Sequence, residues 1–181
     1  SEAEELLERI KKLIEDLKRD AERLLREIEE MIKDIRRHVE EDLRRLREVI
    51  KEIKRLVDER GNTDDLERRV EEISRRNEKN IKDLEDKVRE IVRRLEEVLK
   101  KHKEDTDRLV EKLKEDLKRI KDEEVEREIR RLIEEMKRIS EEVRKEIKRL
   151  IDELEEIVRR AKEALKKLNE ELKRIVDEAK R

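Results

Sequence analysis

Apolar residues recur every three or four positions over three long stretches of this chain, and this period is what most limits its fold. The first series runs from Leu7 to Val57, the second from Leu66 to Ile120 and the third from Val125 to Ala179. A spacing of three and four residues places side chains on one face of an α-helix. Each stretch is therefore predicted to form one amphipathic helix.

Few residues in the chain could interrupt these helices. Proline is absent and glycine occurs once, at Gly61. Gly61 suits the left-handed position that follows many helices, and Thr63 can cap the next helix. The second break is less marked. The apolar spacing slips by one residue between Ile120 and Val125, and Asp122 between them can act as an N-cap.

These breaks predict an all-α fold with helices over about residues 2–60, 64–120 and 123–180. Short connections force consecutive helices to run antiparallel, so we expect an up-down-up three-helix bundle that forms a single domain over residues 1–181. The apolar period is close to 3.6 residues, which predicts nearly straight helices rather than strongly supercoiled ones.

The charge balance excludes two classes of partner. Charged residues make up 61% of the chain, but 54 basic and 56 acidic side chains nearly cancel. A nucleic-acid or anionic-lipid partner requires one sign of charge to dominate a face. No apolar run approaches the roughly 20 residues that span a bilayer. We therefore expect a soluble chain without a targeting signal and without nucleic-acid or membrane partners.

The sequence gives no support for catalysis. Cysteine is absent, and the many carboxylates alternate with Lys and Arg at spacings of three and four, as on a solvated helix surface. No glycine-rich phosphate loop and no Ser, His and Asp arrangement in a strand-turn-helix context is present. We expect no enzyme activity and no cofactor, metal or small-molecule ligand.

The two histidines differ in their positions. His38 lies beside the apolar series, where a boundary residue is expected. His102 and Thr106 lie on the apolar series itself, and the antiparallel arrangement places His102 level with Ala21 and near Ser140. We interpret these residues as a packed polar layer. The alternative is a pH switch, because a buried neutral histidine that must become charged destabilises its surroundings.

Asn77 also interrupts the apolar series of the second helix. The same arrangement places it level with the stretch 163–169 of the third helix, and we predict that it pairs with Asn169. A buried amide without a partner costs about 1–3 kcal/mol, so an amide on a core face is expected to be satisfied across helices. Such a layer penalises slipped packings and would set the helix register.

Taken together, the chain resembles a computationally designed helical bundle. The resemblance rests on three equal helices, a Glu, Lys and Arg surface, the tight connections Gly61-Asn62-Thr63 and Lys121-Asp122-Glu123-Glu124, and the absence of Gln, Phe, Trp, Tyr, Cys and Pro. Isolated polar residues on the core face resemble the buried hydrogen-bond networks of that class. The sequence leaves the localisation open, and for a protein that resembles this class we expect recombinant expression in the cytoplasm.

Two functions are consistent with this sequence. In the first, the protein is a monomeric structural scaffold without biochemical activity, whose property is its stable fold. In the second, it is an interaction module in which helix packing produces a homo-oligomer or a pairing with another designed helical chain. Two to three apolar residues per seven suit either a three-helix core or a core that shares surface with a partner. The monomer is favoured, and a homo- or hetero-oligomer formed through helix packing is the alternative.

Overall fold

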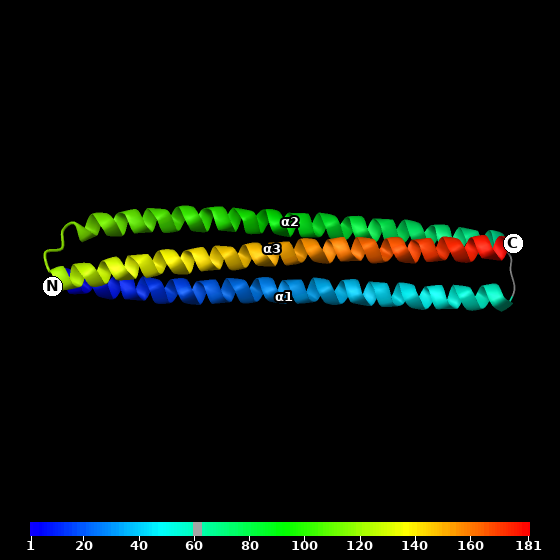
Figure 1. Cartoon of the computed structure of the whole chain (residues 1–181), viewed down its shortest axis with the longest axis horizontal. Helices are drawn as coiled ribbons and strands as arrows, with labels where there is room; N and C mark the ends of the chain where they lie inside the picture. Colours follow the sequence, from blue (N-terminus) through cyan, green and yellow to red (C-terminus); the bar gives the residue numbers. More distant parts are fainter. Residues whose placement is uncertain (60–62) are drawn as a thin grey trace. The chain divides into compact units, whose positions relative to one another are not determined.

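A computed structural model describes residues 1–59 and 63–181 as three helices: α1 over Glu2–Glu59, α2 over Thr63–Leu117 and α3 over Glu123–Lys180 (Figure 1). Their lengths are 58, 55 and 58 residues. No strand occurs in this described part of the chain. The predicted all-α three-helix bundle is confirmed. The proposed roles of Gly61 and of the Thr63 side chain lie outside the described structure.

The chain forms two compact units, and each helix contributes one segment to each unit. Unit 1 comprises Ser1–Glu30 and Val92–Asp152, and unit 2 comprises Met31–Ile91 and Glu153–Arg181. The prediction of a single domain over residues 1–181 stays a prediction.

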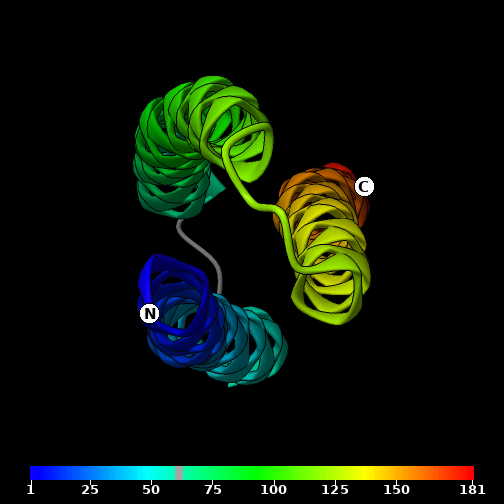
Figure 2. The ribbon, with the colours of Figure 1, turned by 90° about the vertical axis from the view of Figure 1, so that its left-hand side faces the viewer.

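Unit 1 has an aliphatic core to which all three helices contribute. Ile10 of α1, Leu113 of α2 and Ile129 of α3 are fully buried in it, and Met136 is nearly so. Figure 2, viewed from the side of the N-terminus, shows the three segments of this unit around a shared interior. Burying one such side chain contributes about 1.5–3 kcal/mol, so this cluster holds the three segments together.

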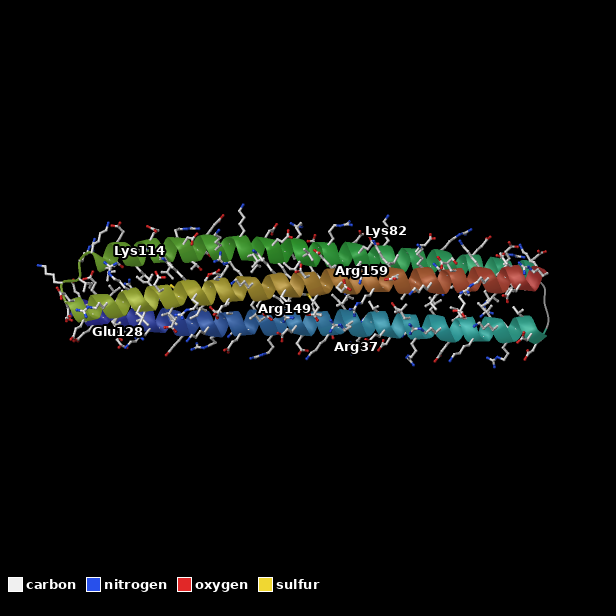
Figure 3. All side chains as sticks on the ribbon, in the orientation of Figure 1. Arg37, Lys82, Lys114, Glu128, Arg149 and Arg159 are labelled. Atoms are coloured by element: carbon white, nitrogen blue, oxygen red, sulfur yellow. The ribbon has the colours of Figure 1, made fainter. Side chains whose placement is uncertain are left out.

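Unit 2 has an equivalent core without aromatic residues. Ile53 of α1 and Leu172 of α3 are fully buried, and Val70 of α2 packs with them. Because the helices have an apolar face and a charged face, burial of the apolar face leaves the charged side chains in solvent. Figure 3 shows this arrangement for Arg37 and Lys82, which point away from the helices.

Ion pairs between helices show which helices run parallel and which run antiparallel within unit 2. Arg36 pairs with Glu153 at 2.5 Å and Lys54 pairs with Glu171 at 2.6 Å, and the partners in both pairs are 117 residues apart. A constant separation means that α1 and α3 are parallel. Lys162 and Lys180 of α3 pair with Glu85 and Glu67 of α2, so α2 numbers fall as α3 numbers rise. In this unit α2 is therefore antiparallel to α3, as predicted.

The end of α2 differs from the prediction. The helix ends at Leu117, not at residue 120, and the connection covers residues 118–122 rather than 121–122. The amide of Ile120 donates to the carbonyl of Leu117 at 3.0 Å, which is a turn contact. Ile120 nevertheless packs against the core of unit 1. The apolar period reflects the burial of the side chain and not the hydrogen bonding of the backbone. The predicted helix was therefore three residues too long at this end.

The start of α3 agrees with the prediction. Oδ1 of Asp122 accepts hydrogen bonds from the amides of Glu124 at 3.0 Å and Val125 at 3.3 Å. These bonds satisfy two amides that have no partner within the first turn of a helix. Asp122 is thus the N-cap of α3.

Candidate functional site

The polar residues on the core face of α2 and α3 meet in pairs or triads inside the units. In unit 2, Nδ2 of Asn77 donates a hydrogen bond to Oδ1 of Asn169 at 3.0 Å. Asn77 is 7% exposed, whereas Asn169 is half-buried. The structure therefore brings together the two amides that the sequence predicts to pair.

In unit 1, Ser140 of α3 is the centre of a polar triad with two residues of α2. Its Oγ lies 3.0 Å from Nε2 of His102 and 3.2 Å from Oγ1 of Thr106, to which it donates. A hydroxyl has a single proton to donate. When that proton goes to Thr106, the Ser140 oxygen accepts from Nε2–H of His102. The predicted layer of His102, Thr106 and Ser140 is thus assembled.

The surroundings of His102 favour its neutral form. Burial is the main cause that lowers its pKa below 6.5; the positive charge of Arg144 lowers the pKa further and the negative charge of Asp105 opposes both. Nε of Arg144 also donates to the carbonyl of Ser140 at 3.4 Å. A neutral imidazole can make the hydrogen bond to Ser140 without placing a charge in the interior.

The contact between Ser140 and His102 superficially resembles half of a hydrolytic triad. A nucleophilic serine must reach its substrate, but Ser140 is fully buried among the helices. The Asp105 carboxylate acts on His102 through its charge, but among the described residues no carboxylate forms a hydrogen bond with the imidazole that could orient it as a base. The geometry is that of a structural layer.

His38 lies on the surface, farther out than the boundary position expected from the sequence. Its side chain is exposed, and Nδ1 lies 2.9 Å from the carbonyl oxygen of Asp34 one turn earlier. Over residues 1–59 and 63–181, no three His, Cys, Asp or Glu side chains form a group suited to a metal ion.

Many carboxylates of residues 1–59 and 63–181 form ion pairs at the surface. Glu156 is an example: side-chain hydrogen bonds from Arg159 and Arg160 lower its pKa from 4.5 to about 2. A carboxyl with this pKa is ionised at neutral pH and cannot act as a general acid. Exposed pairs of this kind contribute only about 0–1 kcal/mol each.

Sequence reasoning did not identify a cavity in unit 2. It has a volume of about 290 Å³ and lies between α1 and α2, with Ala161 and Leu165 of α3 also lining it. The small side chain of Ala161 on the apolar series was the available sign, because alanine leaves space where leucine or isoleucine would fill it. The spacing between helices that opens the cavity is not encoded in any local pattern.

None of the described helices has a stretch long and apolar enough to cross a membrane. No protein family, curated protein or solved structure shows a significant match to this chain.

Proposed function

We propose that the chain is a computationally designed structural scaffold without biochemical activity, whose property is the stable pairing of its helices. The observation that carries this proposal is the pair of polar layers between α2 and α3. Asn77 with Asn169 lies in unit 2, and Ser140 with His102 and Thr106 lies in unit 1. Among the described residues, no buried side-chain nitrogen or oxygen lacks a hydrogen-bond partner.

Fully satisfied layers support a role in specifying the helix register. If α2 slipped by two turns along α3, each amide or hydroxyl would lose its present partner. Each unsatisfied group costs about 1–3 kcal/mol, whereas the aliphatic contacts tolerate many alternative packings. The layers thus select one packing at little gain in stability.

Composition supports the designed origin. A chain with 61% charged residues, no aromatic residue and no proline departs far from the average globular protein. The three described helices are similar in length, with 58, 55 and 58 residues. Idealised elements of matched length are a feature of designed backbones.

Cysteine cross-linking tests the register role. A variant with Glu85→Cys and Lys162→Cys reports the native register, since these side chains are ion-paired at 2.7 Å. A second variant with Glu78→Cys and Lys162→Cys reports a slip of two turns. In the parent chain only the first pair should oxidise to a disulfide. After Asn77→Leu and Asn169→Leu are added, cross-linking of the second pair should rise; an unchanged result would contradict the register role.

The second candidate, an interaction module, is favoured by the exposed aliphatic residues Leu56 and Val98, which are 40% and 36% exposed. Single exposed aliphatic residues are common on monomers, so the scaffold remains the first proposal. Light scattering separates the two. A mass of 22.4 kDa supports the monomer. A measured mass that is a multiple of this value supports self-association, provided that the substitutions Leu56→Lys and Val98→Lys lower it.

A further inference from the structure

The cavity of unit 2 has apolar walls and a polar mouth. Leu43 and Val49 of α1 and Ile81 and Leu84 of α2 line it, together with Ala161 of α3. The four wall side chains are only half-buried, although they lie on the inward faces of their helices. Apolar surface that remains open between helices gains free energy when a ligand covers it.

The size of the cavity limits the occupant to a small molecule. An engineered cavity of about 150 Å³ in another helical protein holds benzene, and drug-sized ligands occupy about 300–1,000 Å³. A volume of about 290 Å³ lies between these cases. It suits an aliphatic chain or a ring system of about ten non-hydrogen atoms.

The mouth of the cavity carries more positive than negative charge. Arg45 and Arg76 line it from α1 and α2, against one carboxylate, that of Asp42. Arg45 and Asp42 form an ion pair at 3.9 Å, so they neutralise each other. Arg76 makes no ion pair or hydrogen bond with any described residue, and its guanidinium is exposed. An anionic group at the mouth would therefore meet an unpaired cation.

Two amides add hydrogen-bonding capacity beside Arg76. Asn80 lines the cavity and is exposed, and Asn77 uses one of its two N–H groups for Asn169. A carboxylate has two acceptor oxygens, so it can accept from a guanidinium and from a neighbouring amide together.

We propose that the cavity of unit 2 binds a small amphipathic carboxylate, with its apolar part between Leu43 and Leu84 and its carboxylate on Arg76. The apolar walls hold the hydrocarbon, and the unpaired guanidinium selects an anion over a cation of the same length. This binding site goes beyond a scaffold role, and the composition gave no indication of it.

Isothermal titration at low salt and pH 7 tests the site with three eight-carbon probes: sodium octanoate, 1-octanol and octylammonium chloride. We expect octanoate to bind at one site per chain and the ammonium compound to bind at least about fivefold more weakly. Arg76→Gln should weaken octanoate binding by about fivefold and leave 1-octanol unchanged. Arg75→Gln is the matched control, because Arg75 pairs with Glu71 and does not line this cavity.

Filling the cavity provides an independent check. Leu84→Trp or Leu43→Trp, each confirmed as folded by circular dichroism, should abolish binding of octanoate and of 1-octanol. The proposal is overturned when no saturable binding occurs, when several octanoate molecules bind per chain, or when neither Arg76→Gln nor a folded tryptophan variant changes the affinity. It is also overturned when light scattering shows a dimer that Leu84→Trp dissociates, since a second copy then fills the site.

Discussion

Asn77 of α2 and Asn169 of α3 are joined by one hydrogen bond of 3.0 Å between Nδ2 and Oδ1, although 92 residues separate them in the sequence. Asn77 is buried and interrupts the apolar series of α2 in unit 2. The energetic consequence depends on whether one partner or both are replaced, because a lone amide keeps its desolvation cost while a pair of apolar residues has none.

Replacement of Asn77 alone should therefore destabilise the fold more than replacement of both amides. We expect Asn77→Ala to lower the free energy of unfolding by about 1 kcal/mol, and Asn77→Leu with Asn169→Leu to leave it unchanged or raise it. Guanidinium denaturation followed by circular dichroism measures both. A double variant less stable than Asn77→Ala would show that the amide pair stabilises the fold.

Ser140→Ala should destabilise unit 1, because it removes the common partner of His102 and Thr106. Loss of a fully buried hydroxyl that bonds two groups is expected to cost about 1–3 kcal/mol. Ser74→Ala, at a half-buried position of α2, is the control and should change stability by less than about 0.5 kcal/mol. Equal effects of the two substitutions would remove the energetic role of the triad.

Acidification should destabilise the parent chain partly through His102. Its pKa is lowered from 6.5 in the folded state, chiefly by burial and then by Arg144, with Asp105 opposing. The unfolded chain therefore binds the proton more readily. The contribution of His102 to stability is fully present above about pH 6.5 and is lost as pH falls from there toward the lowered folded-state pKa.

The matched variant for this prediction is His102→Gln, which keeps a hydrogen-bonding side chain but does not titrate. Urea denaturation measures the free energy of unfolding of both proteins at pH 8 and pH 5.5. Between these two pH values the free energy of unfolding should fall more for the parent chain than for His102→Gln. His38 and all carboxylates are present in both, so their titration cancels in the comparison. Equal losses of stability in the two proteins would argue against a lowered pKa of His102.

Asp122→Ala should weaken the start of α3. The side chain caps the amides of Glu124 and Val125, and loss of an N-cap costs about 0.5–2 kcal/mol. Asp122→Asn retains an accepting oxygen and should cost much less. Chemical denaturation distinguishes the two, and similar losses would point to the charge of Asp122 rather than to its hydrogen bonds.

The ion pair of Lys54 with Glu171 should contribute little, despite its 2.6 Å separation, because both side chains are partly exposed. We expect Lys54→Glu to lower stability by about 0.2–1 kcal/mol at low salt, and the swap Lys54→Glu with Glu171→Lys to restore it. Addition of 1 M NaCl should reduce the loss. A loss that the swap does not restore would show a contribution from packing of the lysine chain.

The sequence was a good guide to the polar layers for a simple geometric reason. Short connections make neighbouring helices antiparallel, so residue numbers alone place Asn77 near Asn169 and His102 near Ser140. That reasoning places residues to within about one helical turn, or roughly 5.4 Å. It could not establish that the side-chain atoms lie 3.0 Å apart in both cases.

The boundary after α2 shows where local patterns are insufficient. Ile120 continues the apolar series because its side chain contacts the core of unit 1, yet its backbone lies in a turn. Side-chain burial and backbone conformation usually agree within a helix, but they separate where a turn folds back over the core. A series of apolar positions alone cannot distinguish the two cases.

By itself, the sequence determined the helical content, the approximate helix limits and the inward faces, because helical hydrogen bonds and amphipathic periods connect residues three or four apart. The tertiary structure alone decided the end of α2 at Leu117, the pairing of α1 with α3 at a separation of 117 residues and the cavity beside Ala161. Those features depend on distances between segments far apart in the chain, and such distances are set by how whole helix faces pack together.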